Sequence, residues 1–490
     1  MTNQFLRTTG ALILLFFSSS LYAQKANLIP DILQKVDSFA NFTIQNNLTP
    51  SLSIAIMKGD EMIFEKAFGK ADIGFDVSAT VNTKYRLIGP TYTVLTALVM
   101  KEVEKGNLFL DQDVTKLLPE FPWQGKKMTL ENLLNVTSGL QDYHYLGDNY
   151  RVGIGDPKTN ADVTELFAGK PFTHNPGEKQ QWTISGYHLA GIILEKVTGK
   201  NFGELIQQEI TTKLNLKNFT HNRGIDVVDN LATPYEKDGD KFINPIHVDP
   251  GIHPFVASVC ASAGDVARFY KAMEDGEIVS KETFSTMLSI PEVAEEKYKA
   301  GEAIDGIGYF MFDIDNFIGR GMNGGITMGY SSDARIYPKQ NLIIVVLANN
   351  LFMADKFTAA QSAQYVTRQI EKLFMNKPIP NLELTSNNTD FNEASFSEEE
   401  ISSLTGTYKI SPLPIPEYSG MEKTAKIYED NGEMMIRFLG ERPMKLYQNG
   451  DFYKIKKYQD LNISFIEGGI EMKLGNNPFI SWKKVDNNLR

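Results

Sequence analysis

The part of the chain that most constrains its fold is the stretch from Tyr85 to Gly106, YRLIGPTYTVLTALVMKEVEKG. It reads as the end of a short strand, a tight turn and then a helix. Pro90 suits the first turn of a helix, because no N–H is needed there and the φ of proline is already helical. Valine and leucine recur after it at helical spacing, and Gly106 is a suitable stop. The pattern predicts an amphipathic helix that is buried in a core.

The elements around this helix follow a regular order. Residues 28–46 have apolar side chains at helical spacing, and residues 51–57 and 61–68 alternate as strands do on either side of a turn at 58–60. Residues 334–350 are rich in strand-forming residues. They resemble the paired central strands, and residues 361–373 the closing helix, of the family whose motifs are described next. The order of the elements resembles that of the α/β lobe of the same family.

Three further segments carry recognisable patterns. Residues 128–140 read MTLENLLNVTSGL, residues 175–200 read NPGEKQQWTISGYHLAGIILEKVTGK, and residues 323–332 read NGGITMGYSS. Together with the 85–106 stretch, they resemble motifs of the penicillin-recognising serine hydrolases, which include class C β-lactamases, DD-peptidases and related esterases. The resemblance extends over roughly residues 28–373, with the motifs in the family's order and spacing. It implies a β-lactamase/transpeptidase-like domain with a central antiparallel sheet and a helical lobe.

The resemblance also implies a catalytic site, and the chain departs from the family there. In the family, an arginine is followed three residues later by S-x-x-K at the start of the helix, where the lysine takes the proton of the serine. Counting on from Arg86, the serine position is Gly89 and the lysine position is Tyr92. Glycine has no side chain, and a phenol with a pKa near 10 is a poor base at neutral pH.

The other two catalytic motifs are replaced as well. The tyrosine and the asparagine of the family's Y-x-N motif correspond to Trp182 and Ile184. An indole N–H can only donate, and isoleucine offers no polar group. The basic residue of the substrate-facing strand corresponds to Asn323, although Gly325 keeps the register of that motif. No catalytic motif is therefore intact.

Two hypotheses follow, and the sequence leaves both open. The first is a protein without catalysis that binds a small-molecule, peptide, glycan or cell-wall-like ligand in a cleft lined by Tyr92, Trp182, Asn323 and Gly325. The alternative is an active serine hydrolase of peptidase, esterase or β-lactamase type with a non-standard nucleophile. The hydroxyl candidates are Thr91, Ser138 and Ser185, although Ser138 also reads as a turn cap and Ser185 as a helix cap. In a third reading, the C-terminal part carries the function.

The first 23 residues have the composition of a secretory signal peptide. An arginine is followed by an apolar run over residues 11–17 and by a small-residue exit at Ala23. An uncleaved anchor is the competing interpretation. Cleavage before Gln24 predicts an exported protein, periplasmic or extracellular, with no membrane span after removal of the signal. The net charge of −11 argues against a nucleic-acid partner.

A change of composition divides the rest of the chain. Residues 377–399 are rich in proline and then in polar and acidic residues, which is typical of a linker. Residues 400–490 contain regularly spaced short strands, with a turn at Asn431-Gly432, and resemble the small lipocalin-like β-barrel domain appended to many secreted members of the family. We therefore expect a β-lactamase-like domain over residues 24–376 and a barrel domain after the linker.

Cysteine and histidine give no sign of a metal or of a cofactor. Cys260 is the only cysteine, so no intrachain disulfide can form, and its surroundings predict a small buried side chain. The six histidines show no ligand spacing such as H-E-x-x-H, and no glycine-rich stretch has the setting of a phosphate-binding loop. We expect no metal and no cofactor.

Overall fold

The computed structural model describes residues 28–145, 155–238, 241–299, 304–314, 317–326, 329–351, 362–377, 379, 392–393, 396–410, 424–438, 443–449, 452–455, 458–466, 469–474 and 477–485. The predicted signal peptide and most of the predicted linker lie outside these residues. The domain boundaries at 376 and 400 and the cleavage before Gln24 therefore stay predictions.

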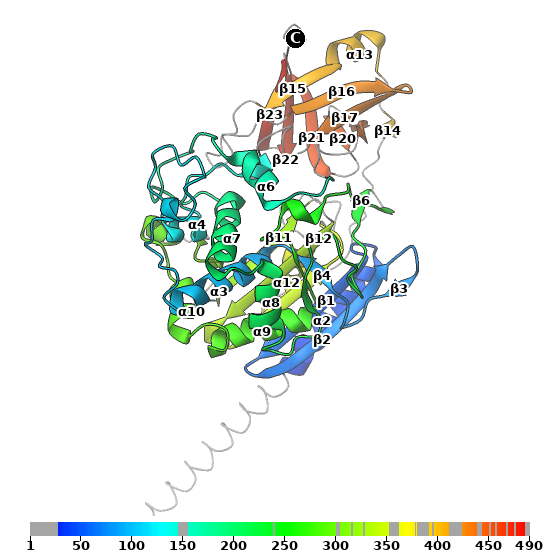
Figure 1. The fold of residues 1–490 in the computed structure, drawn as a ribbon. Coiled ribbons are helices and arrows are strands. Elements are labelled where there is room, and N and C mark those ends of the chain that lie inside the picture. Colours follow the sequence, from blue (N-terminus) through cyan, green and yellow to red (C-terminus); the bar gives the residue numbers. More distant parts are fainter. Residues whose placement is uncertain are drawn as a thin grey trace, which may run out of the picture.

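The larger part of the described chain is built on an antiparallel sheet of eight strands in the order β3-β2-β1-β13-β12-β11-β10-β9 (Figure 1). These strands are β1 (Ser51–Lys58), β2 (Glu61–Asp72), β3 (Val77–Ser78), β9 (Ile304–Asp305), β10 (Phe310–Ile314), β11 (Phe317–Ile326), β12 (Tyr330–Tyr337) and β13 (Leu342–Ala348). The predicted hairpin over residues 51–68 is confirmed, since β1 pairs with β2 around Gly59, which has a φ of 61°. Every residue of β12 and β13 is buried, as expected of central strands that are covered on both faces.

Helices cover both faces of this sheet. On one face lie α2 (Leu28–Gln45) and α12 (Ser362–Phe374), whose apolar side chains share a buried cluster with Ile344 and Val346 of β13. On the other face lie α3 (Gly89–Glu104) and α9 (Ala263–Asp275), which belong to a larger cluster that contains Val345 and Leu347. The alternation along β13 follows from the two-residue period of a strand, which points successive side chains to opposite faces.

A helical lobe and two small sheets complete the first domain. Its remaining helices are α4 (Leu130–Leu134), α6 (Asn160–Phe167), α7 (Ile184–Thr198), α8 (Phe202–Ile206), α10 (Lys281–Met287) and α11 (Glu295–Lys299). Short strands β4 (Tyr85–Leu87), β8 (Val259–Ala261) and β5 (Phe219–His221) form one small sheet, and β6 (Glu236–Asp238) pairs with β7 (Lys241–Ile243). Cys260 on β8 is fully buried, as the sequence predicts.

A buried ion network joins α12 to the sheet. The guanidinium of Arg335 on β12 makes a two-pronged contact with the carboxylate of Asp333, at 2.7 and 2.9 Å, and a third contact of 2.6 Å with Glu371 on α12. The hydroxyl of Tyr337 also donates to Glu371. Burial raises the pKa of Asp333 above its ordinary value, although the neighbouring Arg335 opposes this shift. The single cation therefore compensates two buried carboxylates, and its removal would leave both charges in the core.

The C-terminal part is a second, nearly closed antiparallel barrel-like sheet, drawn in orange to red in Figure 1. Its elements are β14 (Asn392–Glu393), α13 (Glu398–Leu404), β15 (Gly406–Ile410), β16 (Thr424–Asp430), β17 (Glu433–Phe438), β18 (Met444–Lys445), β19 (Tyr447–Asn449), β20 (Phe452–Ile455), β21 (Tyr458–Ile466), β22 (Gly469–Leu474) and β23 (Asn477–Val485). The predicted turn at Asn431-Gly432 is confirmed, with φ of 54° and 83°. The predicted barrel is thus present. Among the described residues, no helix is both long and apolar enough to span a membrane.

Candidate functional site

Helix α3 begins where the sequence places the start of the catalytic-type helix. Strand β4 ends at Leu87, and the N-cap residue, Ile88, has no side chain that could cap the helix. Its backbone N–H instead donates to Ser332 Oγ on β12 at 3.2 Å, and Pro90 lies in the first turn as predicted. The start of α3 is therefore tied to the central sheet by a hydrogen bond between residues far apart in sequence.

Arg86, the basic residue just before this helix, has a structural role. Its side chain is buried, and its guanidinium donates to the backbone oxygens of Asn222 at 2.8 Å and Ala257 at 3.1 Å. A further bond reaches Asn222 Oδ1 at 3.0 Å. Because three of its N–H groups are used within the protein, Arg86 holds two loops against β4 rather than facing a ligand.

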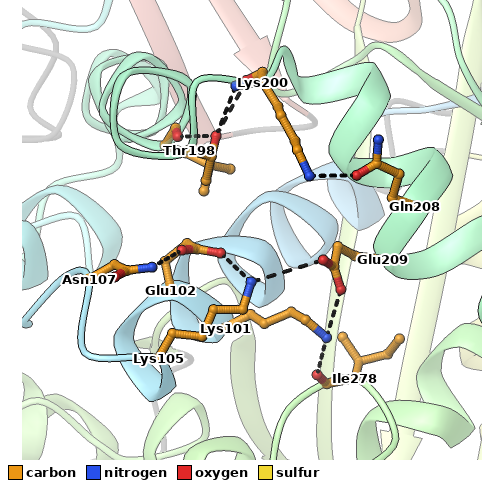
Figure 2. A network of polar contacts seen from close by, with 10 residues as sticks. Lys101, Glu102, Lys105, Asn107, Thr198, Lys200, Gln208, Glu209 and Ile278 are labelled. Carbon is orange, nitrogen blue, oxygen red and sulfur yellow. Dashed lines mark hydrogen bonds and ion pairs between the residues drawn. The ribbon is translucent and has the colours of Figure 1, made fainter.

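The far end of α3 is anchored by the polar network in Figure 2. Lys101 Nζ lies 3.0 Å from Glu209 and 3.3 Å from the carbonyl oxygen of Ile278. Lys105 Nζ lies 2.7 Å from Glu102, one turn earlier on the same helix. With both ends attached to neighbouring segments, α3 forms a fixed platform for the site.

The lysine position of the motif is filled by an aromatic side chain that packs on two others. The ring of Tyr92 lies 5.3 Å from that of Trp182 in an edge-to-face arrangement and 4.8 Å from that of Tyr187. Trp182 and Tyr187 are 6.0 Å apart. We call these three side chains the aromatic triad. Tyr92 is 3% exposed, whereas Trp182 is 37% exposed. The indole is therefore the solvent-accessible part of the triad, and the two tyrosine rings pack on its buried side.

Trp182 is held from its N-terminal side by a loop that follows α4. Gln180 Nε2 donates to the carbonyl oxygen of Asn135 at 3.1 Å, and the backbone N–H of Gln181 donates to that of Val136 at 2.9 Å. Val136 has a φ of 55°, in the left-handed region that a β-branched residue rarely adopts. The strained backbone therefore lies in the loop that holds the segment of the exposed tryptophan.

On its C-terminal side, Trp182 is followed directly by the first turn of α7. Thr183 caps this helix by accepting from the backbone N–H of Ser185 at 3.2 Å, so the prediction that Ser185 is the cap is wrong. Ser185 instead donates its hydroxyl to the carbonyl oxygen of Gln141 at 2.7 Å. Ile184, at the asparagine position of the motif, is buried and donates its backbone N–H to Asp142 Oδ2 at 3.2 Å. Thr183 is the cap because its extended backbone points its hydroxyl toward the N–H groups of the first turn.

The hydroxyl groups proposed as alternative nucleophiles are all buried and used locally. Thr91 Oγ1 donates to the carbonyl oxygen of Leu87 at 2.9 Å, and Ser138 Oγ accepts from the N–H of Leu140 at 3.3 Å. Ser185 Oγ is bound as described above, and Thr91, Ser138 and Ser185 have no exposed surface. None of the hydrogen bonds described for these three groups reaches a lysine, a histidine or a carboxylate.

A shift of the motif by one residue would not supply the missing pair. The serine and lysine positions would then be Pro90 and Thr93. Proline has no nucleophile, and Thr93 Oγ1 donates to the carbonyl oxygen of Gly308 at 2.8 Å in the core. The start of α3 therefore lacks a paired nucleophile and base in either register.

The remaining predicted positions lie on β11. Asn323 pairs with Asp333 and Gly325 pairs with Ser331, both on β12. Helix α3 packs against β11 and also against α7, so it lies between the strand and the helix that carry the other two motifs. The structure thus brings three segments that are far apart in sequence together through α3, and the assignment of their residues to a site stays a prediction.

A buried group of titratable side chains lies behind the first turn of α7, and the sequence reasoning missed it. Asp142 Oδ1 accepts from the backbone N–H of His144 at 2.9 Å, and the two rings of His144 and His253 meet through their Nε2 atoms at 3.1 Å. Burial raises the pKa of Asp142 to about 7 and lowers that of His144 to about 3. The only sequence signal is the close spacing of Asp142 and His144, because His253 lies far along the chain.

Within the described residues, no group of three or more histidine, cysteine, aspartate or glutamate side chains has a geometry that could hold a metal ion. Asp142 and the two histidines are therefore considered as a hydrogen-bonded network.

Comparison with known proteins agrees with this geometry. The sequence model of the Beta-lactamase family matches residues 40–367. The chain belongs to the beta-lactamase family. The match includes the large sheet, α3 and α7, and ends before the barrel. The residues at the start of α3 that differ from the motif therefore lie within the part of the chain that the family model matches.

Two relatives illustrate the distance within the family. The chain is 24% identical over 358 residues to "Protein flp" of Staphylococcus aureus strain MRSA252, which covers 71% of this chain and 66% of that protein. It is 23% identical over 282 residues to "Penicillin-binding protein 4*" of Bacillus subtilis strain 168, which covers 53% of this chain and 59% of that protein. The chain thus spans somewhat less than two thirds of the length of these relatives.

Solved structures show the same fold. An octameric penicillin-binding protein homologue from Pyrococcus abyssi superposes with a TM-score of 0.60 at 20% identity, over 92% of this chain and 99% of that one. A D-amino acid amidase from Ochrobactrum anthropi SV3, complexed with D-phenylalanine, superposes with a TM-score of 0.59 at 18% identity, over 72% of this chain and 99% of that one. The first of these extends over the C-terminal part of this chain as well.

Proposed function

We propose that this chain is an exported beta-lactamase-family protein that does not catalyse hydrolysis and that binds a peptide, glycan or cell-wall-like ligand at the aromatic triad. The observation that carries the proposal is the replacement of the lysine position by Tyr92, whose ring is buried against Trp182. A side chain that fills the place of the base leaves no room for proton transfer at that point.

The absence of a nucleophile at the start of α3 supports the same proposal. Acyl transfer in this family needs a hydroxyl that a neighbouring base can deprotonate. Gly89 offers no hydroxyl, and the next one along the chain, on Thr91, is buried and bound to a backbone carbonyl. Removal of one catalytic group from a set that acts together already abolishes most of the rate, and here several are replaced.

The triad suggests the chemistry of the ligand. Trp182 exposes part of a large ring whose position is fixed from both sides, and such a ring stacks on the apolar face of a sugar or on the plane of a peptide group. Because Tyr92 and Tyr187 prevent the indole from sinking into the core, little side-chain entropy is lost when a ligand binds. A preorganised aromatic surface of this kind favours a glycan or a peptide over a charged small molecule.

The catalytic part of the proposal is tested with acylating probes. We expect no covalent labelling by a fluorescent penicillin and no hydrolysis of nitrocefin or of p-nitrophenyl esters above a heat-killed control. The double substitution Gly89→Ser with Tyr92→Lys places a hydroxyl and an amine one turn apart. We expect it to give little turnover, because Trp182, Ile184 and Asn323 leave proton transfer and substrate orientation unsupported. Labelling of the wild-type protein at one defined hydroxyl would overturn the proposal and identify the nucleophile.

The binding part is tested by isothermal titration calorimetry with soluble peptidoglycan fragments as the probe. We expect a saturable binding heat in the wild-type protein and a loss of affinity of about tenfold or more in Trp182→Ala, which corresponds to about 1.4 kcal/mol. The matched control is Trp123→Phe, because Trp123 is buried and donates its indole N–H to the carbonyl oxygen of Leu118. Equal affinity in the wild-type protein and in Trp182→Ala would remove the triad from the binding site.

Export is tested separately. The signal-like segment 1–23 supports cleavage before Gln24. Mass spectrometry of the protein recovered from the periplasm or the medium should give a mature N-terminus at Gln24. A protein that keeps Met1 and stays with the cytoplasmic fraction would contradict export, and it would leave the binding proposal unaffected.

A further inference from the structure

We propose that Asp142 is a positioning residue for Trp182, and that a proton shared between Asp142 and His144 controls how the segment carrying Trp182 is held. The inference rests on the proposed function only in naming Trp182 as the ligand-facing side chain. The coupling itself is a property of the protein without ligand.

The first step is the clamp on α7. Three consecutive residues, Gln141, Asp142 and Tyr143, each make a hydrogen bond to its first turn. The carbonyl oxygen of Gln141 accepts from Ser185 Oγ at 2.7 Å, Asp142 Oδ2 accepts from the N–H of Ile184 at 3.2 Å, and the N–H of Tyr143 donates to Ser185 Oγ at 3.3 Å. Trp182 lies two residues before Ile184, so only Thr183 separates it along the backbone from the residue that the clamp holds.

The second step is the direction of the hydrogen bonds behind the clamp. The hydroxyl of Tyr143 donates to the carbonyl oxygen of Ile252 at 2.9 Å. The same oxygen lies 3.2 Å from His253 Nδ1, so it accepts from that nitrogen. In a neutral His253, Nε2 is then an acceptor, and the contact of 3.1 Å requires that His144 Nε2 donates. The neutral tautomer of His144 therefore carries no proton on Nδ1.

The third step places the proton. His144 Nδ1 lies 3.5 Å from Asp142 Oδ1. With a lone pair on Nδ1 and a negative charge on the carboxylate, the two atoms would repel each other, so one proton is needed between them. It resides either on the carboxyl group or on the imidazole, and the pair titrates as one unit. The same carboxyl group is the acceptor for Ile184, which links this proton to the clamp.

The burial of these side chains determines which of them holds the proton. Asp142 and His253 are buried, and the His144 side chain is only 15% exposed. Among the residues that the structure describes, the other titratable or charged groups near this network include Tyr143 and His188, with Arg223 acting on His188. Burial raises the pKa of Asp142 to about 7 and lowers the pKa of His144 and His253, so the carboxyl group is the favoured place for the proton.

Loss of the proton has two consequences. The carboxylate becomes a stronger acceptor for the N–H of Ile184, because charge-assisted hydrogen bonds are shorter and stronger. It is also repelled by the lone pair of His144 Nδ1, which pushes the two side chains apart. Both effects displace the loop against α7 in the same titration, and we expect the surroundings of Trp182 to change with it.

The experiment measures tryptophan emission against pH without any ligand, as the difference between the wild-type protein and Trp182→Phe. We expect one transition within about one pH unit of 7. Asp142→Asn, measured against Asp142→Asn with Trp182→Phe, should abolish it, and His144→Gln should shift its midpoint. The matched control is Asp113→Asn, because Asp113 also caps a short helical turn but is only partly buried, and it should keep the transition.

A second measurement uses the infrared difference between the wild-type protein and Asp142→Asn, because burial also raises the pKa of Glu274 to about 7. In this difference, the band of a protonated carboxyl group should be present at acidic pH in the folded protein and disappear over the same pH range as the emission changes. A flat emission profile, a transition that persists in Asp142→Asn, or no carboxyl band in acid would each overturn the inference. If the transition occurs but peptidoglycan fragments do not bind, the proposed function fails and the coupling stands.

Discussion

Replacement of Tyr92 by alanine tests whether the side chain at the lysine position has become part of the core. Tyr92 is 3% exposed and packs on Trp182 and Tyr187 at ring distances of 5.3 and 4.8 Å. Truncation of a buried large aromatic side chain costs about 3–5 kcal/mol, and two lost ring pairs account for about 1–3 kcal/mol of that. We expect the free energy of unfolding to fall by about 4 kcal/mol.

The assay is urea unfolding followed by circular dichroism and by tryptophan emission. Because the indole of Trp182 loses its support in Tyr92→Ala, its emission in the folded state should also shift to that of a more exposed tryptophan. The matched control is Phe75→Ala, since Phe75 is 86% exposed, and its stability should stay within about 0.5 kcal/mol of the wild-type value. A loss below about 1 kcal/mol in Tyr92→Ala with unchanged emission would show that Tyr92 does not support Trp182.

Two further predictions concern charge. Arg335→Met should lower the free energy of unfolding by about 3–5 kcal/mol, because it leaves two buried carboxylates without their cation. The control, Arg268→Met, removes a half-exposed ion pair and should cost less than about 1 kcal/mol. Equal losses of the two variants in urea unfolding would contradict the argument. Burial lowers the pKa of His188 to about 3 and of His221 to about 4, so the stability they contribute is complete above pH 6.5 and is lost as the pH falls toward 4. We expect a slope of about 1.4 kcal/mol per pH unit for each, measured by urea unfolding, and a shallower slope in His221→Gln; an unchanged slope would exclude His221 as a source.

The fold could be predicted to a large extent because its signals are local. Strand alternation and the turn at Gly59 predict the first hairpin, and Thr129 and Asn132, three positions apart, form a capping box at the start of α4. The short strands of the barrel are likewise set by turns such as Asn431-Gly432. These features depend on residues within a few positions of one another, which a single sequence displays directly.

The candidate site could be predicted only as a set of positions. The sequence alone shows that Gly89 carries no nucleophile and that Tyr92 is a poor base at neutral pH, since both properties depend on residue type. It does not show that Ser185 binds Gln141 rather than capping its own helix, because Thr183 competes for the same first turn. The extended backbone of Thr183 decides which of the two side chains caps the helix.

The sequence by itself determined the family, the order of the elements and which residue types stand at the positions that the resemblance assigns to catalysis, because these follow from motifs and periodicity. Only the tertiary structure decided that Tyr92 is buried beneath an exposed Trp182, and that His144 meets His253 across 109 positions of the chain. The physical reason is that burial, and the pKa changes that it causes, depend on which distant segments exclude water from a side chain. In this protein those segments are the 141–143 loop, the start of α7 and the loop that carries His253.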